Sequence, residues 1–440
     1  MLRADNREAF TPGEEKSAER PWPAGAARAT TRGMPRRDRL FYGWIIVASV
    51  FVATAMAAGT IYAFPAFFAS FAHAFAADRF EISLIFAVTE AVWFLTGFAA
   101  GVLADRIGPR PVVLAGSLVM AGGLALAASA TSLAGLGVAY GGGVGLGGGL
   151  MYVPSVGVVQ RWFRRRRGLA SGLAICGTGV GTLVVPFLAA LAIDSVGWAA
   201  THRALAVAVL VLCGTAGLFL IGSPGEIGLA PDGDPPTAEA GPPPLAGATL
   251  GEAVATRAFR LLYLASLTSS AAVFITYVHL VPQARDVGLS ARRAITLVGA
   301  LGVAATLGRF VIGGLADRAG RRPALALMFA GLTASMVWWR LAPPSFVTLM
   351  IYAVGFGTFY GGSITVLPVL TADLFGARRI SSIIGLLYTS WAVGALAGPP
   401  LAGLLYEASG GYGLAILAGA LCMAVATLAC LAVRAPPRAA

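Results

Sequence analysis

Twelve long apolar runs, separated by short polar segments, make up most of the chain. A helix needs about 20 apolar residues to cross the hydrocarbon core of a bilayer, and every run reaches that length within a few residues. The pattern therefore predicts an all-α integral membrane protein with twelve transmembrane helices. The expected helices cover 41–71, 82–105, 111–131, 134–160, 168–193, 203–222, 258–284, 293–316, 322–340, 346–372, 380–405 and 411–433.

One long polar segment, 223–257, interrupts the series after the sixth run and contains seven prolines. It predicts a cytoplasmic Pro-rich linker between two six-helix bundles, at 40–222 and 258–434. Residues 1–39 carry nine basic and six acidic side chains, so we expect a disordered cytoplasmic tail, and Met34 would also serve as a start. Residues 435–440 are expected to form a short cytoplasmic tail.

The two halves repeat each other. Residues 101–111 read Gly-Val-Leu-Ala-Asp-Arg-Ile-Gly-Pro-Arg-Pro, and residues 313–323 read Gly-Gly-Leu-Ala-Asp-Arg-Ala-Gly-Arg-Arg-Pro, 212 positions later. Phe163 and Phe375, each followed by an arginine pair, are separated by the same offset. Two unrelated loops with one offset indicate a duplicated six-helix unit, and hence two pseudo-symmetric bundles.

Composition and charge support the membrane interpretation. Hydrophobic residues make up 57% of the chain and charged residues 12%, which excludes a soluble enzyme. The net charge of +12 comes from arginines between apolar runs, so nucleic acid is not an expected partner. Sixteen arginines fall in one set of loops and the C-terminal tail, against six in the other loops. The positive-inside rule then predicts both termini in the cytoplasm, in the cell inner membrane.

No pattern for catalysis, a cofactor or a metal emerges from the sequence. Gly143, Gly145 and Gly148 match the spacing of a dinucleotide fingerprint, but no strand precedes them, and close helix packing explains them better. The cysteines lie inside apolar runs without metal-ligand spacing. We expect neither an enzyme, nor a cofactor, nor a bound metal, and no obligate protein partner is evident.

Arg309 is the basic residue placed well inside a predicted span. An ionisable side chain at mid-bilayer costs roughly 2.5–3.5 kcal/mol on insertion scales, so its presence needs a reason. A guanidinium offers a planar fork that matches a carboxylate, which makes Arg309 the first candidate for binding an anionic substrate. Alternatively, it caps helix carbonyls or pairs permanently with a carboxylate.

Glu90 is the acidic counterpart, near the middle of the second predicted helix. It is a candidate for proton coupling, but it would equally serve as a protonated group bonded to a neighbouring helix, or as a partner that neutralises Arg309. His279, in the outer part of the seventh helix, is more typical of a packed, hydrogen-bonded histidine, with gating or proton relay as the alternative.

Several aromatic residues lie within the predicted helices rather than at their ends. A phenol gives a small oxygen-rich solute a hydrogen bond beside an apolar wall, although packing is the commoner use. The candidates for lining a substrate pocket are Tyr62, Tyr152, Tyr360, Tyr388 and Trp391. Prolines at 65, 154 and 368 are expected to break the first, fourth and tenth helices.

The duplicated Asp-Arg loops resemble the signature of the major facilitator superfamily. The resemblance covers residues 40–434 and implies twelve helices, alternating access and a cytoplasmic charge network that locks the outward-facing state. It would place Asp105, Arg106, Asp317 and Arg318 in that gating network. Pro109 stands where a basic residue is usual, which implies a thinner network in the first half.

A narrower resemblance lies between the fourth and fifth helices. Residues 162–181 are similar to the signature of the monocarboxylate porters, as are Gly43-Trp44 and Tyr62-Ala-Phe64-Pro65. Bacterial oxalate–formate antiporters share much of this pattern. The resemblance implies that Arg309 pairs with the substrate carboxylate.

This chain departs from those families at the positions that carry the other charges. Ala305 and Ala66 occupy the positions of the acidic and lysine residues that the proton-coupled porters use, and Trp391 occupies that of the oxalate carriers' lysine. Glu90 then becomes the substitute candidate for proton coupling. One central cation rather than two favours a monoanion over a dicarboxylate.

These observations predict a secondary active transporter that moves a small monocarboxylate across the membrane by alternating access, with protons as the expected co-substrate. An organic-anion exchanger of the oxalate–formate type and an efflux carrier for larger amphiphiles are the alternatives. A more remote alternative is a non-transporting membrane sensor, which we would expect to carry an appended signalling domain.

Overall fold

The computed structural model describes residues 41–77, 79–234 and 246–434. Its helices confirm the predicted fold class, because twelve of them in the described part are long and apolar enough to cross a membrane. The predicted disordered tail 1–39, with Met34, and the C-terminal tail 435–440 lie outside the described residues, as does 235–245 of the linker.

The helices of the first half follow the predicted runs within a few residues. They are α1 (Tyr42–Tyr62), α2 (Phe64–Phe75), α3 (Arg79–Ile107), α4 (Pro109–Ala127), α5 (Leu133–Val138), η1 (Ala139–Gly145), α6 (Leu146–Trp162), α7 (Arg167–Val196) and α8 (Trp198–Leu218). The linker contributes two 3₁₀ turns and a short helix, η2 (Pro224–Ile227), η3 (Pro231–Gly233) and α9 (Leu250–Ala255). The second half contains α10 (Arg257–Asp286), α11 (Ala291–Ala319), α12 (Arg321–Leu341), α13 (Phe346–Phe375), α14 (Ile380–Ser409) and α15 (Gly413–Ala432).

Only one of the three predicted proline breaks occurs. The first span divides into α1 and α2 at Ala63, and Pro65 stands in the first turn of α2, where its missing N–H costs nothing. Pro154 and Pro368 instead lie inside the unbroken helices α6 and α13, so those two predictions were wrong. Both prolines are buried between neighbouring helices, and packing holds each helix together despite one lost backbone bond.

The fourth span, predicted as one helix over 134–160, has a π-helical segment in its glycine-rich part. η1 joins α5 to α6 without a break in the chain direction. A Cβ added at Gly123 of α4 would lie 2.5 Å from Cα of Gly143, so the two backbones touch at this point. Because neither glycine has a side chain, the backbone of η1 can adopt the wider π-helical turn and approach the backbone of α4 closely.

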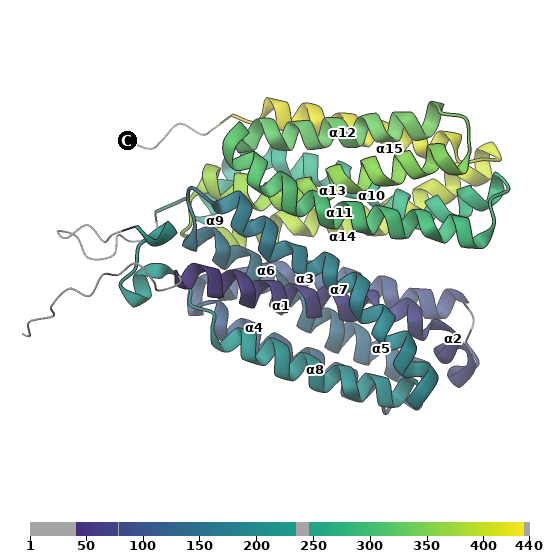
Figure 1. The fold of residues 1–440 in the computed structure, drawn as a ribbon, viewed down its shortest axis with the longest axis horizontal. Helices are drawn as coiled ribbons and strands as arrows, with labels where there is room; N and C mark the ends of the chain where they lie inside the picture. The colour runs from purple at the N-terminus through teal and green to yellow at the C-terminus, as the bar shows by residue number, and fades with distance from the viewer. Residues whose placement is uncertain (1–40, 78, 235–245, 435–440) are drawn as a thin grey trace, which may run out of the picture. The chain divides into compact units, whose positions relative to one another are not determined.

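The two halves of the chain lie side by side, and two helix pairs, α3 with α14 and α7 with α11, make most of the contacts between them (Figure 1). Within the halves, α1 packs on α7 and α11 packs on α13, whereas α3 contacts α14 and α7 contacts α11 across the interface. Phe41 and Arg434 lie at the same end of the spans, which we call the tail end, and the opposite end is the far end.

Glycine contacts show the pseudo-symmetry directly. A Cβ at Gly101 of α3 would strike the backbone at Ser381 of α14, and a Cβ at Gly313 of α11 would lie 2.5 Å from the carbonyl oxygen of Gly168 in α7. Gly101 and Gly313 are the 212-residue equivalents, and Gly168 and Ser381 match within one residue. The same close helix crossing is thus built twice, once from each copy of the repeat.

Replacing Gly181 with leucine is expected to abolish the folded transporter. A Cβ at Gly181 would overlap the carbonyl oxygen of Ala55 in α1, so α1 and α7 would have to separate. The cost should exceed the roughly 1–3 kcal/mol typical of overpacking, because backbone must move. Gly122→Leu is the matched control, since no atom lies within 4 Å of a Cβ there. Size-exclusion chromatography in detergent should show a monodisperse peak for the control alone; a normal peak for both variants would contradict the packing argument.

Candidate functional site

One face of α3 is directed toward the second half of the chain. Gly97 on this face packs against Gly385 of α14, and the ring of Phe94 lies 6.2 Å from that of Trp391. Glu90 precedes Phe94 by four residues and therefore shares its face, one turn nearer the far end. The structure thus places Glu90 at the interface between the halves, where it is buried at 5% exposure.

Arg309 lies on the face of α11 that packs against α7. A Cβ added at Gly179 of α7 would come within 2.7 Å of Nη1 of Arg309, so the guanidinium occupies the space that the glycine leaves. The side chain is buried at 6% exposure, and its Nε has no hydrogen-bond partner among the described residues. Cys176 donates a hydrogen bond to the carbonyl oxygen of Thr306, which holds the two helices together beside the guanidinium.

The two buried charges do not neutralise each other in this arrangement. Among the residues with described side chains, neither forms an ion pair within 4.0 Å, and both carboxylate oxygens of Glu90 lack a hydrogen-bond partner. By the 212-residue repeat, Gly97 of α3 is the position equivalent to Arg309. Glu90 precedes Gly97 by seven residues, so it lies about 10 Å nearer the far end along the helix. One unpaired cation and one unpaired carboxylate therefore stand at different depths of one interface.

Two of the predicted aromatic residues, one from each half, face each other in the part of the interface that contains Arg309. Tyr152 of α6 and Tyr388 of α14 face each other across the interface with ring centroids 6.0 Å apart, and both lie within electrostatic range of Arg309. Trp93 of α3 packs edge-on against Tyr152 at 5.5 Å. The hydroxyl of Tyr388 makes no hydrogen bond within 3.5 Å among the described residues, and the hydroxyl of Tyr152 is its polar neighbour.

A second aromatic group comes from the C-terminal half. The ring of Tyr360 lies 5.9 Å from Tyr277 and 6.1 Å from Trp391, and Trp391 also packs against Phe274. The indole N–H of Trp391 donates to Oγ of Ser266 at 3.1 Å, which fixes the ring. Tyr277 was not predicted as a site residue, although it lies within the seventh predicted helix, as the predicted tyrosines lie within theirs.

The third group surrounds Glu90. The ring of Tyr62, at the end of α1, lies 6.3 Å from Phe86 and 6.3 Å from Trp93. Tyr62 and Tyr360 are both within electrostatic range of the Glu90 carboxylate, and Tyr360 is also within range of Arg309. Tyr360 therefore links the two charged ends of the aromatic surface.

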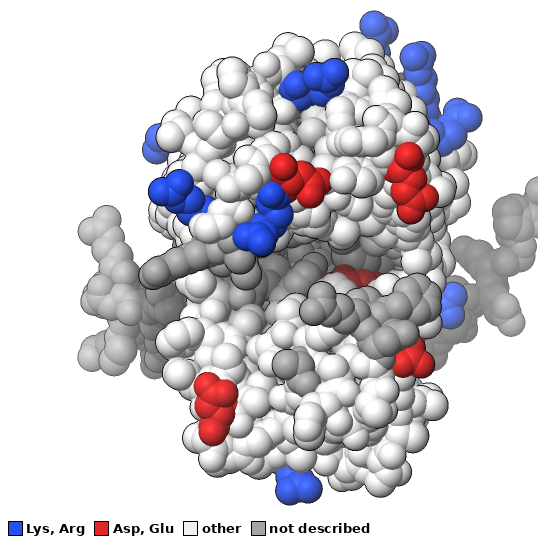
Figure 2. Space-filling model, turned by 90° about the vertical axis from the view of Figure 1, so that its right-hand side faces the viewer, with Lys and Arg blue, Asp and Glu red and all other residues white. Residues whose placement is uncertain are grey.

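The interface is hollowed at the far end. Figure 2 looks onto this end and shows a hollow between the two halves. Tyr277 is 37% exposed although its ring packs against Tyr360. The structure thus brings together five of the predicted site residues, Arg309, Tyr152, Tyr360, Tyr388 and Trp391. Glu90 and Tyr62 lie on the far-end side of this cluster.

His279 is not part of this cluster. Its Nε2 lies 3.1 Å from the carbonyl oxygen of Pro399, and its Nδ1 lies 3.4 Å from the hydroxyl of Tyr412. Tyr412 is in the loop between α14 and α15, where partial burial raises the pKa of its phenol. These bonds are those of a packed histidine within the C-terminal half.

The tail end is held together by a first cluster around Asp105. Asp105 forms an ion pair with Arg161 in which both side chains are buried. It also accepts hydrogen bonds from the backbone N–H of Ser381 at 3.3 Å and of Ser382 at 2.7 Å, at the start of α14. A carboxylate from the first half therefore caps a helix N-terminus of the second half.

The second copy of the repeat builds the reciprocal cluster. Asp317 accepts from the backbone N–H of Gly168 at 2.9 Å and of Leu169 at 3.0 Å, at the start of α7. Arg321 contacts Asp317 at 3.0 Å and Asp373 at 2.6 Å, and Asp373 also binds Nη1 of Arg167 at 2.6 Å. The two halves are thus tied twice at the tail end.

The predicted gating cations need correction. Arg106 and Arg318 are exposed and have no described bond in this network. The cations that pair with the acidic residues are Arg161, Arg167 and Arg321, which the sequence analysis took for loop charges. One signal was available, because Arg161 and Asp373 occupy equivalent positions, 212 residues apart, with opposite charge.

The described parts of the linker form hydrogen bonds with the two equivalent loops at the tail end, one in each half. The carboxylate of Asp232 accepts from the backbone N–H of Arg164 and Arg165, each at 2.9 Å. After the undescribed segment, Ala248 donates to the carbonyl oxygen of Phe375 at 2.8 Å. A capping box then starts α9, and the bonds from Thr249 lower the pKa of Glu252.

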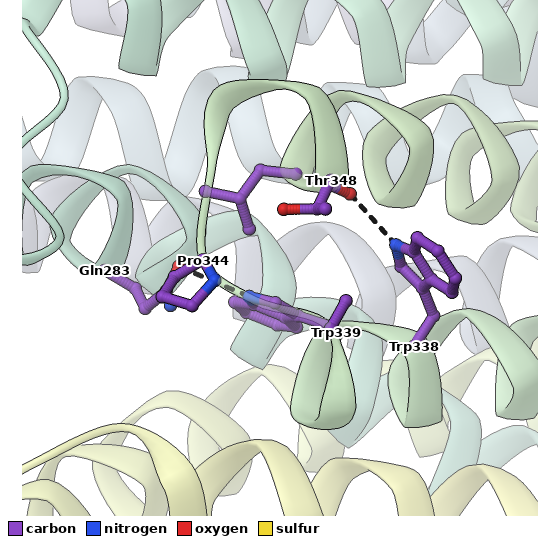
Figure 3. Close-up of a pocket in the computed structure, with 7 residues that line it drawn as sticks. Gln283, Trp338, Trp339, Pro344 and Thr348 are labelled. Carbon is purple, nitrogen blue, oxygen red and sulfur yellow. Dashed lines mark hydrogen bonds between the residues drawn. The ribbon is translucent and has the colours of Figure 1, made fainter.

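Two further cavities do not fit a polar solute. The first, between α10, α12 and α13, has a volume of about 10 Å³, and Figure 3 shows it closed by the bond from Trp338 to the carbonyl oxygen of Thr348, at 3.0 Å. It has room for about one water. The second is an open groove of about 440 Å³ between α1, α7 and α11, lined mainly by apolar side chains, Phe51 and Phe310 among them.

Comparison with known families places the chain among membrane transporters. The family profile of the Major Facilitator Superfamily matches residues 50–339 and 262–440. Monocarboxylate transporter 12 of Rattus norvegicus is 28% identical over 398 residues, covering 86% of this chain and 82% of the relative. Monocarboxylate transporter 3 of Rattus norvegicus is 31% identical over 405 residues, covering 88% of this chain and 80% of the relative.

Solved structures agree with this fold. The E. coli fucose:proton symporter FucP superposes with a TM-score of 0.68 at 17% identity, covering 89% of this chain and 98% of that chain. A structure of FucP in the outward conformation gives a TM-score of 0.69 at 17% identity, covering 90% of this chain and 100% of that chain. At this identity the likeness establishes the fold alone.

Proposed function

The chain belongs to the Major Facilitator Superfamily, whose members are secondary transporters rather than enzymes, and we propose that its solute is a small monocarboxylate. The chain is accordingly a multi-pass membrane protein. The observation that carries the substrate proposal is Arg309, a buried guanidinium without a carboxylate partner at the aromatic interface between the halves. The names of the monocarboxylate transporter relatives support the same substrate class.

The carboxylate would bind the fork of Arg309, and the facing phenols of Tyr152 and Tyr388, with ring centroids 6.0 Å apart, would complete the site. Tyr360 and Trp391 would form its apolar wall toward the far end. A single cation matches a single carboxylate, whereas a dicarboxylate would bury a second charge without a partner. The arrangement of these side chains and the predicted anion site at Arg309 together support the roles proposed for them.

The same geometry supports alternating access. We assign the tail end to the cytoplasm of a cell inner membrane, because the arginine-rich loops lie there. The ties of Asp105 and Asp317 then close the cytoplasmic end while the hollow faces outward. Breaking them would let the halves rock and expose Arg309 to the cytoplasm.

Coupling to protons is proposed through Glu90 or through the substrate itself. Glu90 forms no ion pair among the described residues and has the phenol of Tyr62 as a polar neighbour, so a proton can be taken up there without breaking an ion pair. Exchange of one organic anion for another remains the alternative mode. The apolar groove beside Thr306 and Cys176 is the one observation in favour of a larger amphiphile.

Thermal unfolding of the detergent-purified protein tests the substrate class. The panel comprises acetate, propionate, lactate, pyruvate, formate, oxalate and succinate at two pH values. A ligand at about 100 times its dissociation constant adds roughly 2.7 kcal/mol to the folded state, which raises the midpoint measurably. We expect stabilisation by monocarboxylates and not by dicarboxylates. A response to the dicarboxylates alone, or to none of the panel, would contradict the proposal.

A further inference from the structure

The interface contains two buried ionisable side chains, one basic and one acidic, that form no ion pair among the described residues, and the proposed function uses only one of them as a substrate ligand. Arg309 accounts for a carboxylate. Glu90 retains two oxygens without a hydrogen-bond partner among the described residues. Burying an unpaired charge is costly, so a transport site that contains both gains most from an occupant that carries both charges.

We propose that the substrate is a zwitterionic monocarboxylate, whose carboxylate binds Arg309 and whose cationic group binds Glu90 on the far-end side of the site. The proposal rests on the proposed function and narrows its substrate class. The pair of charges makes the site neutral as a whole, so a neutral zwitterion leaves no net charge in the membrane, whereas a monoanion leaves Glu90 unmatched.

The placement of both side chains supports one continuous site. Glu90 shares its helix face with Phe94, whose ring lies 6.5 Å from Phe274 and 6.2 Å from Trp391 in the second half. Tyr360 is within electrostatic range of both Glu90 and Arg309. The two charges therefore flank the same aromatic surface rather than two separate cavities.

The surroundings of Glu90 suit a cation. Three aromatic rings lie near the carboxyl group, those of Tyr62, Phe86 and Trp93. The ring centroid of Tyr62 lies 6.3 Å from that of Phe86 and 6.3 Å from that of Trp93. An ammonium group over an aromatic face gains a cation–π attraction in addition to its ion pair. An apolar tail, in contrast, would leave the carboxylate without a partner.

The spacing between the charges predicts a length for the substrate. Glu90 lies about 10 Å nearer the far end than the helix position equivalent to Arg309. Both helices run from the far end to the tail end, so both side chains lean toward the far end and much of that offset is preserved. Glycine is too short to touch both groups, and affinity should rise along the series of linear ω-amino acids.

The test compares matched pairs that differ only in the terminal group. Binding of glycine, β-alanine, γ-aminobutyrate, 5-aminovalerate and 6-aminohexanoate to the purified full chain is measured by calorimetry beside acetate, propionate, butyrate, valerate and hexanoate. We expect the best amino acid to bind at least tenfold more tightly than its alkanoate, and to be longer than glycine. Glu90→Gln should remove this preference, and a monodisperse peak in size-exclusion chromatography shows that the variant folds.

A second variant tests position rather than charge. Glu90→Asp keeps the carboxylate but withdraws it by one methylene, so the best amino acid should become one methylene longer. Alkanoate binding that depends on Arg309 but shows no amino preference would overturn the zwitterion and leave the proposed function standing. An amino preference that survives in Glu90→Gln would overturn the role of Glu90. The monocarboxylate proposal itself would fail if neither series bound.

Discussion

Arg309→Gln is expected to lower saturable monocarboxylate uptake by at least 100-fold while the protein remains folded. Removing one partner of a buried, hydrogen-bonded charge pair costs about 3–5 kcal/mol, which corresponds to two or more decades in affinity. Glutamine preserves much of the side-chain length and part of the polarity, so helix packing at Gly179 should persist. Uptake is measured with radiolabelled substrate in proteoliposomes that contain equal amounts of protein.

The control for this substitution is Arg203→Gln, which neutralises an exposed arginine of α8. Its uptake should equal that of the unmodified chain. Arg309→Lys separates charge from geometry, because an ammonium group retains the charge but lacks the planar fork. We expect partial recovery relative to Arg309→Gln. Undiminished uptake by the glutamine variant would show that Arg309 is not the anion site.

Much of the fold was accessible from the sequence because it depends on local hydrophobicity. Each span is long enough to cross a membrane by itself, and the 212-residue repeat is visible as identical loop residues. The π-helical segment η1 was not predictable, because it depends on the contact of Gly143 with Gly123 in another helix. The continuity of α6 and α13 has a similar cause. Packing against neighbouring helices stabilises a proline inside each helix, where local rules predict that the helix breaks.

The site was predictable where one residue carried the signal. Arg309 and Glu90 stood out as charges inside apolar runs, and the structure brings both to the interface. The relative position of Arg309 and Glu90 was not predictable, because packing fixes the rotation and depth of each helix. The contact of Phe94 with Trp391 is an example of such packing. The tail-end cations were misassigned for a similar reason. Loop position alone does not distinguish Arg161, which is paired and buried, from its exposed neighbours.

The carboxylate of Asp105 should control the equilibrium between the two orientations of the transporter through its contacts with α14. It is fully buried and caps the start of α14 in the second half through Ser381 and Ser382, whereas its ion pair with Arg161 lies within the first half. The cap is lost when the tail end opens and the ion pair is not, so only the cap favours the tail-closed state over the tail-open state. An amide oxygen accepts these bonds more weakly than a carboxylate, by about 1–2 kcal/mol, so Asp105→Asn is expected to shift the equilibrium toward the tail-open state by about 5- to 30-fold.

Distances between spin labels at residues 166 and 378 report this shift in a cysteine-free background. Both positions carry exposed arginines on the equivalent tail-end loops of the two halves, 212 residues apart. Asp105→Asn should move the distance distribution to longer values, and Asp317→Asn should do the same, because it uncaps α7 at Gly168 and Leu169. Asp194→Asn, which changes an exposed carboxylate near the far end of α7, should leave the distribution unchanged. If the two gate variants kept the distribution of the unmodified chain, the tail-end carboxylates would be structural caps rather than a gate, and the closed state would depend on the glycine crossings at Gly101 and Gly313 instead.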